Sequence, residues 1–285
     1  MPRAIHESSI VDRHAELADD VEIGPFCQVR AGVRIGSGTR LTSHVVVTGN
    51  TTLGASNVIH PFTVIGGVAQ VRKGPDNEGT RQALEIGDHN VFRESVTVNT
   101  SSGAGTTRIG SYNLFMAGSH VAHDVVVGSR CVVANGVQLA GHVQLEDWVT
   151  FGGLSGVAQH VRVGQGAFVA AGAMCESDVP PFVIVQGDRA RVRALNVVGL
   201  ERRQVPSGSV HALRRAYAHL WGSKTRTTSL CDLVATLDRS DPWVHALAEW
   251  LADPVRRVRP AKRGALALGA FRRLESESST RPGAP

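Results

Sequence analysis

The chain has few aromatic side chains and no long apolar run. Only 5% of its 285 residues are Phe, Trp or Tyr, which suits a narrow core filled by aliphatic side chains better than a broad globular core. No run approaches the ~20 apolar residues that a membrane-spanning helix needs. Residues 1–10 also hold no charged segment followed by a long apolar stretch, as a signal peptide would. We therefore expect a cytoplasmic protein without a transmembrane segment.

Cysteine is scarce as well, with four residues in the chain. Cys27, Cys131 and Cys175 fall at positions of the repeat described below where small core side chains are expected, whereas Cys231 stands alone. This distribution favours packing in a core over a disulfide framework or a metal cluster.

The balance of charge is moderately basic, with a net charge of +5 and a pI near 9.4. Part of the positive charge lies in residues 253–285, which we expect to be disordered because Ser, Pro, Gly and Ala dominate there. No motif of a nucleic-acid reader accompanies the charge, so we expect no nucleic-acid partner. An acidic protein or a phosphorylated small molecule fits the charge instead.

Large apolar residues recur at every sixth position along most of the chain. Three series carry this period: Ile5, Val11, Leu17, Ile23, Val29, Ile35, Leu41, Val47, Leu53, Ile59 and Ile65; then Ile86, Phe92 and Val98; then Ile109, Phe115, Val121, Val127, Val133, Leu139, Leu145, Phe151, Val157, Val163, Val169 and Cys175. An α-helix would need a period of about 3.6 and an isolated strand a period of about 2. The period of six therefore excludes both as the repeating unit.

A small side chain lies two residues before nearly every member of these series, for example Ala15, Cys27 and Ala167. Spacings of two and then four describe a short strand with two inward side chains followed by a bend. This is the hexapeptide repeat of a parallel β-helix, an all-β solenoid. Gly36 and Gly54 are separated by three hexapeptides, as are other glycines of the repeat. Three hexapeptides therefore form one coil, and we expect glycine where a corner turns tightly.

Two segments interrupt the repeat, 66–85 and 99–108, and both are interpreted as loops that leave a corner of the coil. The repeat ends near Pro180 and Pro181. We therefore assign residues 1–190 to the β-helix, 191–252 to a small C-terminal helical domain and 253–285 to the basic tail.

Three helices are predicted in the C-terminal domain from apolar residues at helical spacing: 207–221, 230–237 and 243–251. Asp241 and Pro242 form the start signal of the last helix. We expect these helices to pack on one end or flank of the prism.

Residues one full coil apart in sequence lie above one another at the strand spacing of ~4.8 Å. His123, Gly141 and Gln159 then form one outward column, and Asp124, His142 and His160 form the next, with His120 on the same rung. A neutral imidazole with a pKa near ~6.5 can take a proton from an alcohol, and a neighbouring carboxylate fixes its tautomer. Zinc held by His120, His123 and His142 is the competing interpretation, although one face of one chain presents them as a flat array.

Six further motifs occur along the repeat and just beyond it: residues 94–98 (ESVTV), 120–124 (HVAHD), 139–143 (LAGHV), 178–181 (DVPP), 186–187 (QG) and the stretch 196–203. In this order, and over roughly residues 5–220, the chain resembles the acyl-carrier-protein-dependent UDP-N-acetylglucosamine O-acyltransferases of lipid A synthesis. The resemblance implies a left-handed β-helix and a homotrimer with active sites between neighbouring prisms. It also implies acyl carrier protein and a UDP-sugar as partners, with the thioester of the carrier's phosphopantetheine as co-substrate and no metal or other cofactor.

The resemblance also implies roles for individual residues. His123 would be the general base that deprotonates the sugar 3-hydroxyl, Asp124 would orient it, and the Gly141 N–H would stabilise the oxyanion. The residues implied in substrate binding are Lys73, His120, His142, Gln159, Asn196, Arg202 and Arg203. Ala171, with Phe168 beside it, would limit the depth of the acyl chain.

Four departures from the family pattern lie near the implied sugar site: Val71, the segment 99–101, Ala158 and Val198. The reaction class is therefore better supported than the identity of the acceptor. Three alternatives remain: an acyltransferase that acts on another UDP-amino sugar, with N-acylation as one form, a non-catalytic β-helix paralogue, and a metal-dependent hydratase on the same scaffold.

Overall fold

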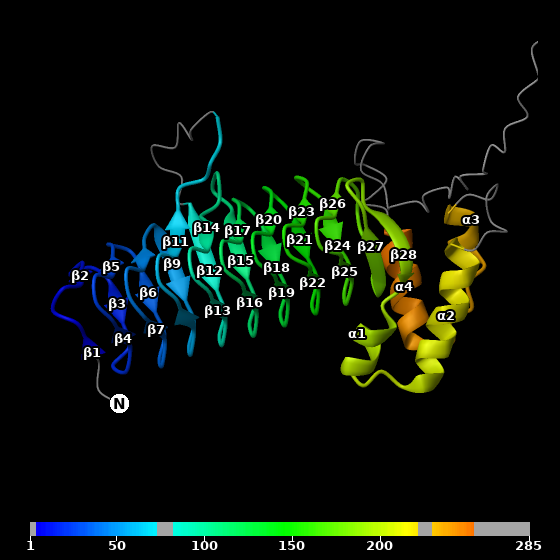
Figure 1. The fold of residues 1–285 in the computed structure, drawn as a ribbon, viewed down its shortest axis with the longest axis horizontal. Coiled ribbons are helices and arrows are strands. Elements are labelled where there is room, and N and C mark those ends of the chain that lie inside the picture. The colour runs from blue at the N-terminus through cyan, green and yellow to red at the C-terminus, as the bar shows by residue number, and fades with distance from the viewer. Residues whose placement is uncertain (1–3, 73–81, 222–229, 254–285) are drawn as a thin grey trace, which may run out of the picture.

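The computed structural model describes residues 4–72, 82–221 and 230–253. Most of this chain forms a three-sided prism in which each coil contributes one short strand to each of three sheets (Figure 1). Strands in the prism pair in parallel with the equivalent strand of the next coil, for example Val132 with Thr150. The fold is therefore the left-handed parallel β-helix that the sequence led us to expect.

Each face of the prism is one sheet. The first sheet holds β1 (Ala4–Ile5), β4 (Glu22–Ile23), β7 (Arg40–Leu41), β10 (Val58–Ile59), β13 (Val91–Phe92), β16 (Leu114–Phe115), β19 (Val132–Val133), β22 (Thr150–Phe151), β25 (Phe168–Val169), β27 (Val183–Gln186) and β28 (Arg191–Leu195). The second holds β2 (Ile10–Val11), β5 (Gln28–Val29), β8 (Val46–Val47), β11 (Val64–Gly67), β14 (Thr97–Asn99), β17 (His120–Val121), β20 (Gln138–Leu139), β23 (Gly156–Val157) and β26 (Met174–Cys175). The third holds β3 (Glu16–Leu17), β6 (Arg34–Ile35), β9 (Asn50–Leu53), β12 (Ala83–Ile86), β15 (Thr106–Ile109), β18 (Val126–Val127), β21 (Gln144–Leu145) and β24 (Arg162–Val163).

The predicted inward residues fill the core of the prism from the second coil onward. Ile59, Phe115 and Val133 are completely buried, and the rings of Phe92 and Phe115 stack with centroids 4.9 Å apart. The first coil is the end of the prism, so Ile5 there remains 42% exposed.

Three corners join the faces, and each is a column of residues with positive φ. The histidine corner comprises Asp124, His142 and His160; the small corner comprises Gly118, Gly136, Leu154 and Gly172; the aromatic corner comprises Tyr112, Arg130, Trp148 and Gly166. Non-glycine residues hold many of these left-handed positions, which usually cost energy. The corners therefore place selected side chains at fixed outward points.

The glycines that recur once per coil have a different cause from the expected one. Gly36, Gly110 and Gly128 do not have positive φ, so a tight turn does not require them. A Cβ atom on Gly36 would lie 2.7 Å from the carbonyl carbon of Gly54 in the next coil, and one on Gly110 would lie 2.7 Å from the carbonyl oxygen of Gly128. Close stacking of successive coils therefore excludes any larger residue.

The two loops lengthen two successive coils. Leu53 pairs with Ile86 and Ile86 with Ile109, so each of these coils is longer than three hexapeptides. The regular coil length returns between Ile109 and Val127. Lys73 and residues 73–81 of the first loop lie outside the described residues. The second loop, between β14 and β15, lies on the prism beside the histidine corner, because Ser102 contacts Asp124.

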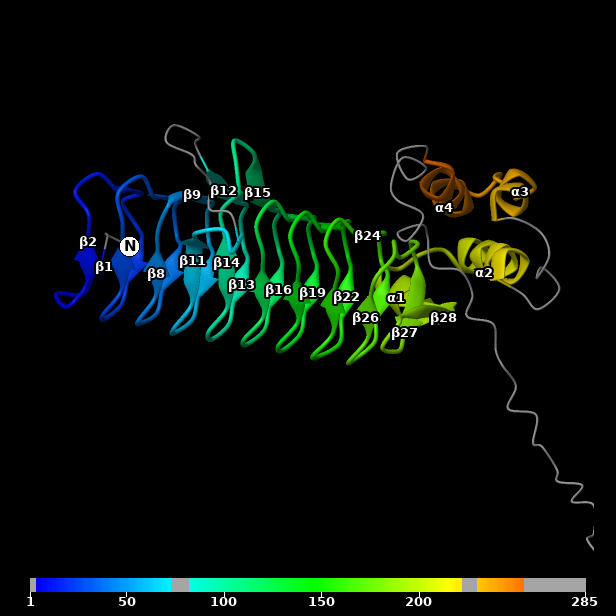
Figure 2. The ribbon, with the colours of Figure 1, turned by 90° about the horizontal axis from the view of Figure 1, so that it is seen from above.

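The C-terminal part begins with an antiparallel hairpin of β27 and β28, which the sequence analysis missed. It continues into α1 (Val197–Arg202), α2 (Ser207–Trp221), α3 (Leu230–Ala235) and α4 (Pro242–Ala252). Helix α2 has the predicted bounds, α3 is shorter than predicted, and Asp241 caps α4 as expected. Figures 1 and 2 show the helices at the C-terminal end of the prism. The division at residue 190 stays a prediction, and the tail after Asp253 lies outside the described residues.

A polar cluster joins α4 to the prism. The Arg162 guanidinium donates to Glu146 (2.8 Å) and to Asp253 (2.6 Å), and the Trp250 indole N–H donates to the same Glu146 oxygen at 2.7 Å. Charge-assisted bonds of this kind are stronger than neutral ones. Among the described residues, no helix is long and apolar enough to span a bilayer.

Candidate active site

The predicted histidine and glycine columns exist. The backbone N–H of His142 donates to the carbonyl of His123 (3.0 Å), and that of His160 donates to the carbonyl of Gly141 (3.1 Å). The rings of His142 and His160 stack with centroids 4.5 Å apart. Successive coils therefore stack in register at this corner and bring imidazoles and a carboxylate together.

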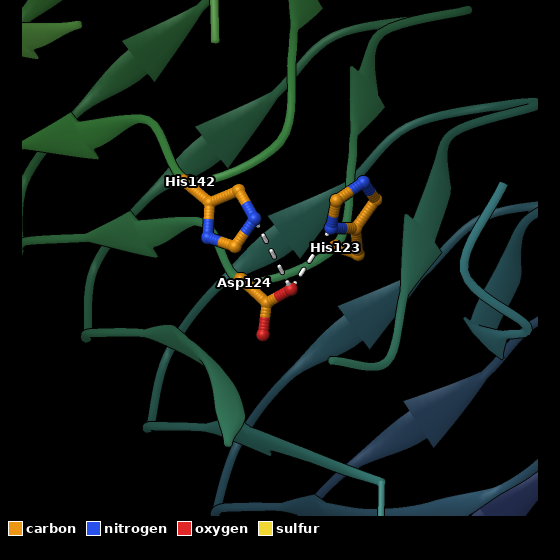
Figure 3. Close-up of side chains that lie close together, drawn as sticks. All are labelled: His123, Asp124 and His142. Atoms are coloured by element: carbon orange, nitrogen blue, oxygen red, sulfur yellow. Dashed lines mark hydrogen bonds and ion pairs between the residues drawn. The ribbon is translucent and has the colours of Figure 1, made fainter. Parts of the chain in front are cut away.

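His123 and Asp124 form the closest contact of the cluster. The His123 Nδ1 lies 2.8 Å from the Asp124 Oδ2, and Figure 3 shows the imidazole directed at this oxygen. The His123 side chain is only 8% exposed. The sequence predicted an outward side chain, and the ring does lie outside the core, but its neighbours at the corner cover it within a single chain.

Gly141 provides the surface on which the imidazole of His123 lies. A Cβ atom on Gly141 would be 2.6 Å from the His123 Cε1 and 2.7 Å from its Nε2. Glycine is therefore the residue that lets the imidazole lie so close to the backbone. Within the described part of the chain, the Gly141 N–H has no hydrogen-bond acceptor.

Asp124 is held by a residue that the sequence analysis missed. The Ser102 hydroxyl donates to the Asp124 Oδ2 at 2.6 Å, and the Ser102 backbone N–H donates to the same oxygen at 3.1 Å. Burial raises the pKa of the Asp124 carboxyl, but the hydrogen bonds from Ser102 and His123 outweigh it, so the pKa lies below its ordinary value. The carboxylate is therefore charged at neutral pH.

Two more histidines border this pair. The His142 Nε2 lies 3.8 Å from the Asp124 Oδ2. The His120 Nδ1 is hydrogen-bonded to the Thr97 hydroxyl at 2.7 Å. Burial, together with the nearby His123, lowers the pKa of His120, which keeps that imidazole neutral near pH 7.

The zinc alternative named His120, His123 and His142 as ligands, but the group that the structure brings together is a different one. His123, Asp124 and His142 place one donor atom each within 4.8 Å of one another, a spacing that a metal ion can bridge, and His120 is not part of this group. The same contacts also suit a base and its orienting carboxylate, in which the Nδ1 of His123 faces Asp124.

The other implied binding residues lie farther away. Gln159 is exposed on the next coil of the histidine corner. Asn196 is buried, caps α1 by accepting from the Gly199 N–H, and donates to the Gly166 carbonyl. The structure thus gives Asn196 local partners and places it beside the aromatic corner.

Arg202 and Arg203 end helix α1. Arg202 is exposed, whereas the Arg203 guanidinium lies over the rings of Trp148 and Trp243, 5.4 and 5.1 Å from their centroids. Burial lowers the pKa of Arg203. Arg203 therefore lies at the aromatic corner, a different corner of the same prism from the one that carries His123.

The two residues implied in chain-length selection lie on the far side of the second face. Ala171 is exposed in the bend that contains Gly172 of the small corner. Phe168 projects from β25 on the first face and pairs with Ile184. The second face, which carries β17, β20, β23 and β26, separates this corner from the histidine corner.

Comparison with known proteins identifies the class and then the family. The family model for bacterial transferase hexapeptide repeats matches residues 14–49 and 106–141, which places the repeats of the prism in the class found in hexapeptide transferases. The model described as UDP N-acetylglucosamine O-acyltransferase, domain 2, matches residues 178–259.

Solved structures cover nearly the whole chain. The UDP-N-acetylglucosamine O-acyltransferase (LpxA) from Moraxella catarrhalis is 35% identical, with 92% of this chain and 99% of that chain covered and a TM-score of 0.82. LpxA from Acinetobacter baumannii is 35% identical over 86% and 95% of the two chains, with a TM-score of 0.79. The Arabidopsis UDP-N-acetylglucosamine acyltransferase is 30% identical over 92% and 99%, with a TM-score of 0.79. The chain belongs to the UDP-N-acetylglucosamine O-acyltransferase family.

Proposed function

We propose that this enzyme transfers an acyl chain, with or without a 3-hydroxyl group, from acyl carrier protein to the 3-hydroxyl of UDP-N-acetylglucosamine, the first step of lipid A synthesis. The sugar oxygen forms a bond to the thioester carbonyl carbon, and the bond from that carbon to sulfur breaks. The hydroxyl proton passes to His123 and then to the leaving thiolate of the carrier. Family membership supports the substrates, and the geometry of the histidine corner supports the mechanism.

The observation that carries the mechanism is the 2.8 Å contact between the His123 Nδ1 and the Asp124 Oδ2. A carboxylate at Nδ1 fixes the tautomer in which Nε2 is free to accept a proton, and it stabilises the imidazolium that forms. Because the pKa of Asp124 is held low, the carboxylate keeps its charge across the pH range in which an imidazole titrates. His123 is therefore proposed as the general base.

The Gly141 N–H is proposed as the oxyanion donor. It lies against the imidazole and has no acceptor among the described residues, so it is available to the thioester oxygen as negative charge develops there. Base and oxyanion donor both belong to the protein, and no metal or organic cofactor is needed in this scheme. Activity that survives exhaustive chelation, with metal content measured alongside, would support this part of the proposal.

The acceptor is proposed to bind along the histidine corner, against His120, His142 and Gln159. Lys73, which the family resemblance implies in binding, lies outside the described residues. Arg202 and Arg203 lie at another corner of the same chain, as does Asn196, which orders the helix that carries them. We propose that these residues reach the uridine and phosphate end from a neighbouring subunit of a homotrimer. Light scattering that shows an active monomer would contradict this arrangement.

Substrate identity is tested by incubating the purified enzyme with a mixture of acyl carrier proteins and UDP-sugars and by analysing the products by mass spectrometry. The proposal predicts one dominant product, UDP-N-acetylglucosamine that carries one ester-linked acyl chain. An amide-linked product on an amino sugar would identify the alternative acceptor. Absence of any acylated product from all mixtures would contradict the enzymatic assignment.

A further inference from the structure

The aromatic corner continues into the C-terminal helices as a column in which rings and guanidinium groups alternate. The Arg130 Cζ lies 4.8 Å from the centroid of the Tyr112 ring and 5.1 Å from that of the Trp148 ring. The Arg203 Cζ lies 5.4 Å from the centroid of Trp148 and 5.1 Å from that of Trp243 in α4. We call these five residues the ring column. Trp148 is therefore the ring that lies against both arginines.

Gly166 leaves the room that Arg203 occupies in this column. Residue 166 follows Trp148 on the next coil of the aromatic corner, with a φ of +63°. A Cβ atom at this position would lie 2.5 Å from the Arg203 Nη1, so a side chain here would displace the guanidinium. Arg203, which follows helix α1, therefore fills the place that a side chain of the prism would otherwise take.

Arg203 carries its charge without an anionic partner. Its Nη1 is buried and has no hydrogen-bond acceptor among the residues that the structure describes, whereas Arg162, beside α4, is paired with Glu146 and Asp253. Burial lowers the pKa of Arg203, and the nearby charge of Asp147 offsets part of this effect. An arginine remains protonated in proteins. The charged donor is therefore left unsatisfied, which is costly in a folded protein.

The rings restrain this guanidinium in a way that a carboxylate would not. An aromatic face attracts a cation through its quadrupole, but it supplies no oxygen that would neutralise the charge. A carboxylate at the same place would occupy the N–H groups with which a guanidinium binds phosphate. Contact with Trp148 thus holds Arg203 in place and keeps its charge available to an anionic ligand.

We propose that Trp148 is a positioning residue for the acceptor, because it holds the Arg203 guanidinium where it binds the diphosphate of the UDP-sugar. The inference rests on the proposed function, in which Arg203 reaches the phosphate end, and adds the residue that keeps this arginine in position. Trp148 is 37% exposed at a corner, so the core of the prism does not depend on it. The competing role is structural, in which the ring column only attaches the helices to the prism.

The test replaces Trp148 by leucine and by phenylalanine. Leucine removes the ring, and the fold accepts leucine at a corner with positive φ, since Leu154 has a φ of +58°. A cation–π contact is worth a factor of roughly 2 to 30 in affinity, so the KM for UDP-N-acetylglucosamine should rise about tenfold in Trp148→Leu while kcat stays within about twofold. Trp148→Phe keeps an aromatic face and should restore most of the affinity.

Tyr112→Leu is the matched control. Tyr112 holds the same corner two coils before Trp148, and its ring lies against Arg130 and His89. Its loss should leave the KM for the UDP-sugar unchanged. The KM for acyl carrier protein should be unchanged in all these variants. A rise in the carrier KM alone would overturn the proposal, because the phosphate of the carrier's arm would then be the ligand.

A double-mutant cycle with Arg203→Gln separates positioning from direct contact. Trp148→Leu should have little further effect on the KM for the UDP-sugar once the guanidinium is gone. An equal rise in both backgrounds would overturn the proposal, since Trp148 would then act without the arginine. A wild-type KM in Trp148→Leu would also overturn it, in favour of the structural role.

A second variant keeps the test decisive if Trp148→Leu does not fold. Gly166→Ala introduces the Cβ atom that displaces the Arg203 guanidinium from the column. It should therefore raise the KM for the UDP-sugar by an independent route, with the carrier KM unchanged. A folded Gly166→Ala variant with wild-type KM values would contradict the requirement for Arg203 at this point.

Binding of UDP alone, measured by calorimetry, distinguishes failure of this inference from failure of the proposed function. If the wild type binds UDP but transfers no acyl group, the proposed function fails, and weaker UDP binding by Trp148→Leu still supports the positioning role. If the wild type transfers acyl groups and Trp148→Leu binds UDP equally well, the positioning role alone fails. A wild type that neither binds UDP nor transfers acyl groups would contradict both.

Discussion

Replacing Gly141 by alanine should disable the enzyme, because the new methyl group displaces the imidazole ring of His123. The new Cβ atom would lie 2.6 Å from the His123 Cε1, whereas ordinary contacts of a Cβ atom begin at 3.4 Å. The imidazole must therefore move by about 0.8 Å, away from the position in which it is bonded to Asp124. A misplacement of about 1 Å can cost ~10²-fold in rate, so we expect kcat to fall by about two orders of magnitude.

The fold should survive this substitution, because Gly141 does not have positive φ and its backbone conformation accepts alanine. Gly208→Ala is the matched control, since a Cβ atom at Gly208 meets nothing within 4 Å. Steady-state transfer assays and thermal melts of both variants provide the comparison. Wild-type kcat in Gly141→Ala, at an unchanged melting temperature, would refute the claim that His123 must lie against this glycine.

Three further predictions concern the support of the base, the donor and the scaffold. Ser102→Ala should lower kcat about tenfold, as expected for loss of a hydrogen bond to a charged group. In the wild type the pKa of Asp124 lies below its ordinary value of 3.8, so the carboxylate loses its charge only when the pH falls through that lowered pKa. Without the Ser102 hydroxyl the pKa should rise, and the loss of activity in acid should therefore begin at a higher pH. Ser102→Thr should keep both the rate and the pH profile of the wild type. Ala171→Met should shift the preferred donor to a chain several methylenes shorter, because each displaced CH₂ loses about 0.8 kcal/mol, and donor profiles by mass spectrometry that do not change would show that the chain ends elsewhere. Asn90→Ala should lower the free energy of unfolding by roughly 3 kcal/mol, because the buried Asn90 side chain bonds three groups of the adjoining coils, including the Asn113 N–H; a melting curve that matches the wild type would contradict this.

The coil geometry could be predicted because one period governs the whole scaffold. A spacing of six sets the inward positions, and three such repeats per coil place Asp124 under His142 and His160, whose stacked rings follow from that register. The helices were also accessible, since Ser207–Trp221 and the cap at Asp241 follow local rules of spacing and capping.

Contacts that cross an irregular coil could not be predicted in the same way. Ser102 and Asp124 are 22 residues apart because the second loop lengthens the coil between them, so arithmetic in units of whole hexapeptides does not pair them. Arg162 and Asp253 are 91 residues apart and meet only through the packing of α4 on the prism. No local pattern in the sequence encodes such a contact.

The burial of His123, the proposed base, could not be predicted from the sequence either. The spacing places His123 outside the core, and this is correct, but spacing says nothing about the neighbours that cover a side chain at a corner. The absence of a side chain at Gly141 lets the ring lie against the backbone, where it is 8% exposed. A glycine one full coil after a candidate base is the signal from which this packing could have been inferred.

The central claim is that His123 removes the proton from the acceptor hydroxyl. It is tested most directly by single-turnover acyl transfer to UDP-N-acetylglucosamine with His123→Ala, and with His123→Gln as a variant that preserves more of the buried volume. General-base catalysis contributes typically ~10²–10⁴-fold, so both variants should lose that factor in rate while their melting curves and assembly state match the wild type. Wild-type rates in a folded His123 variant would contradict the account.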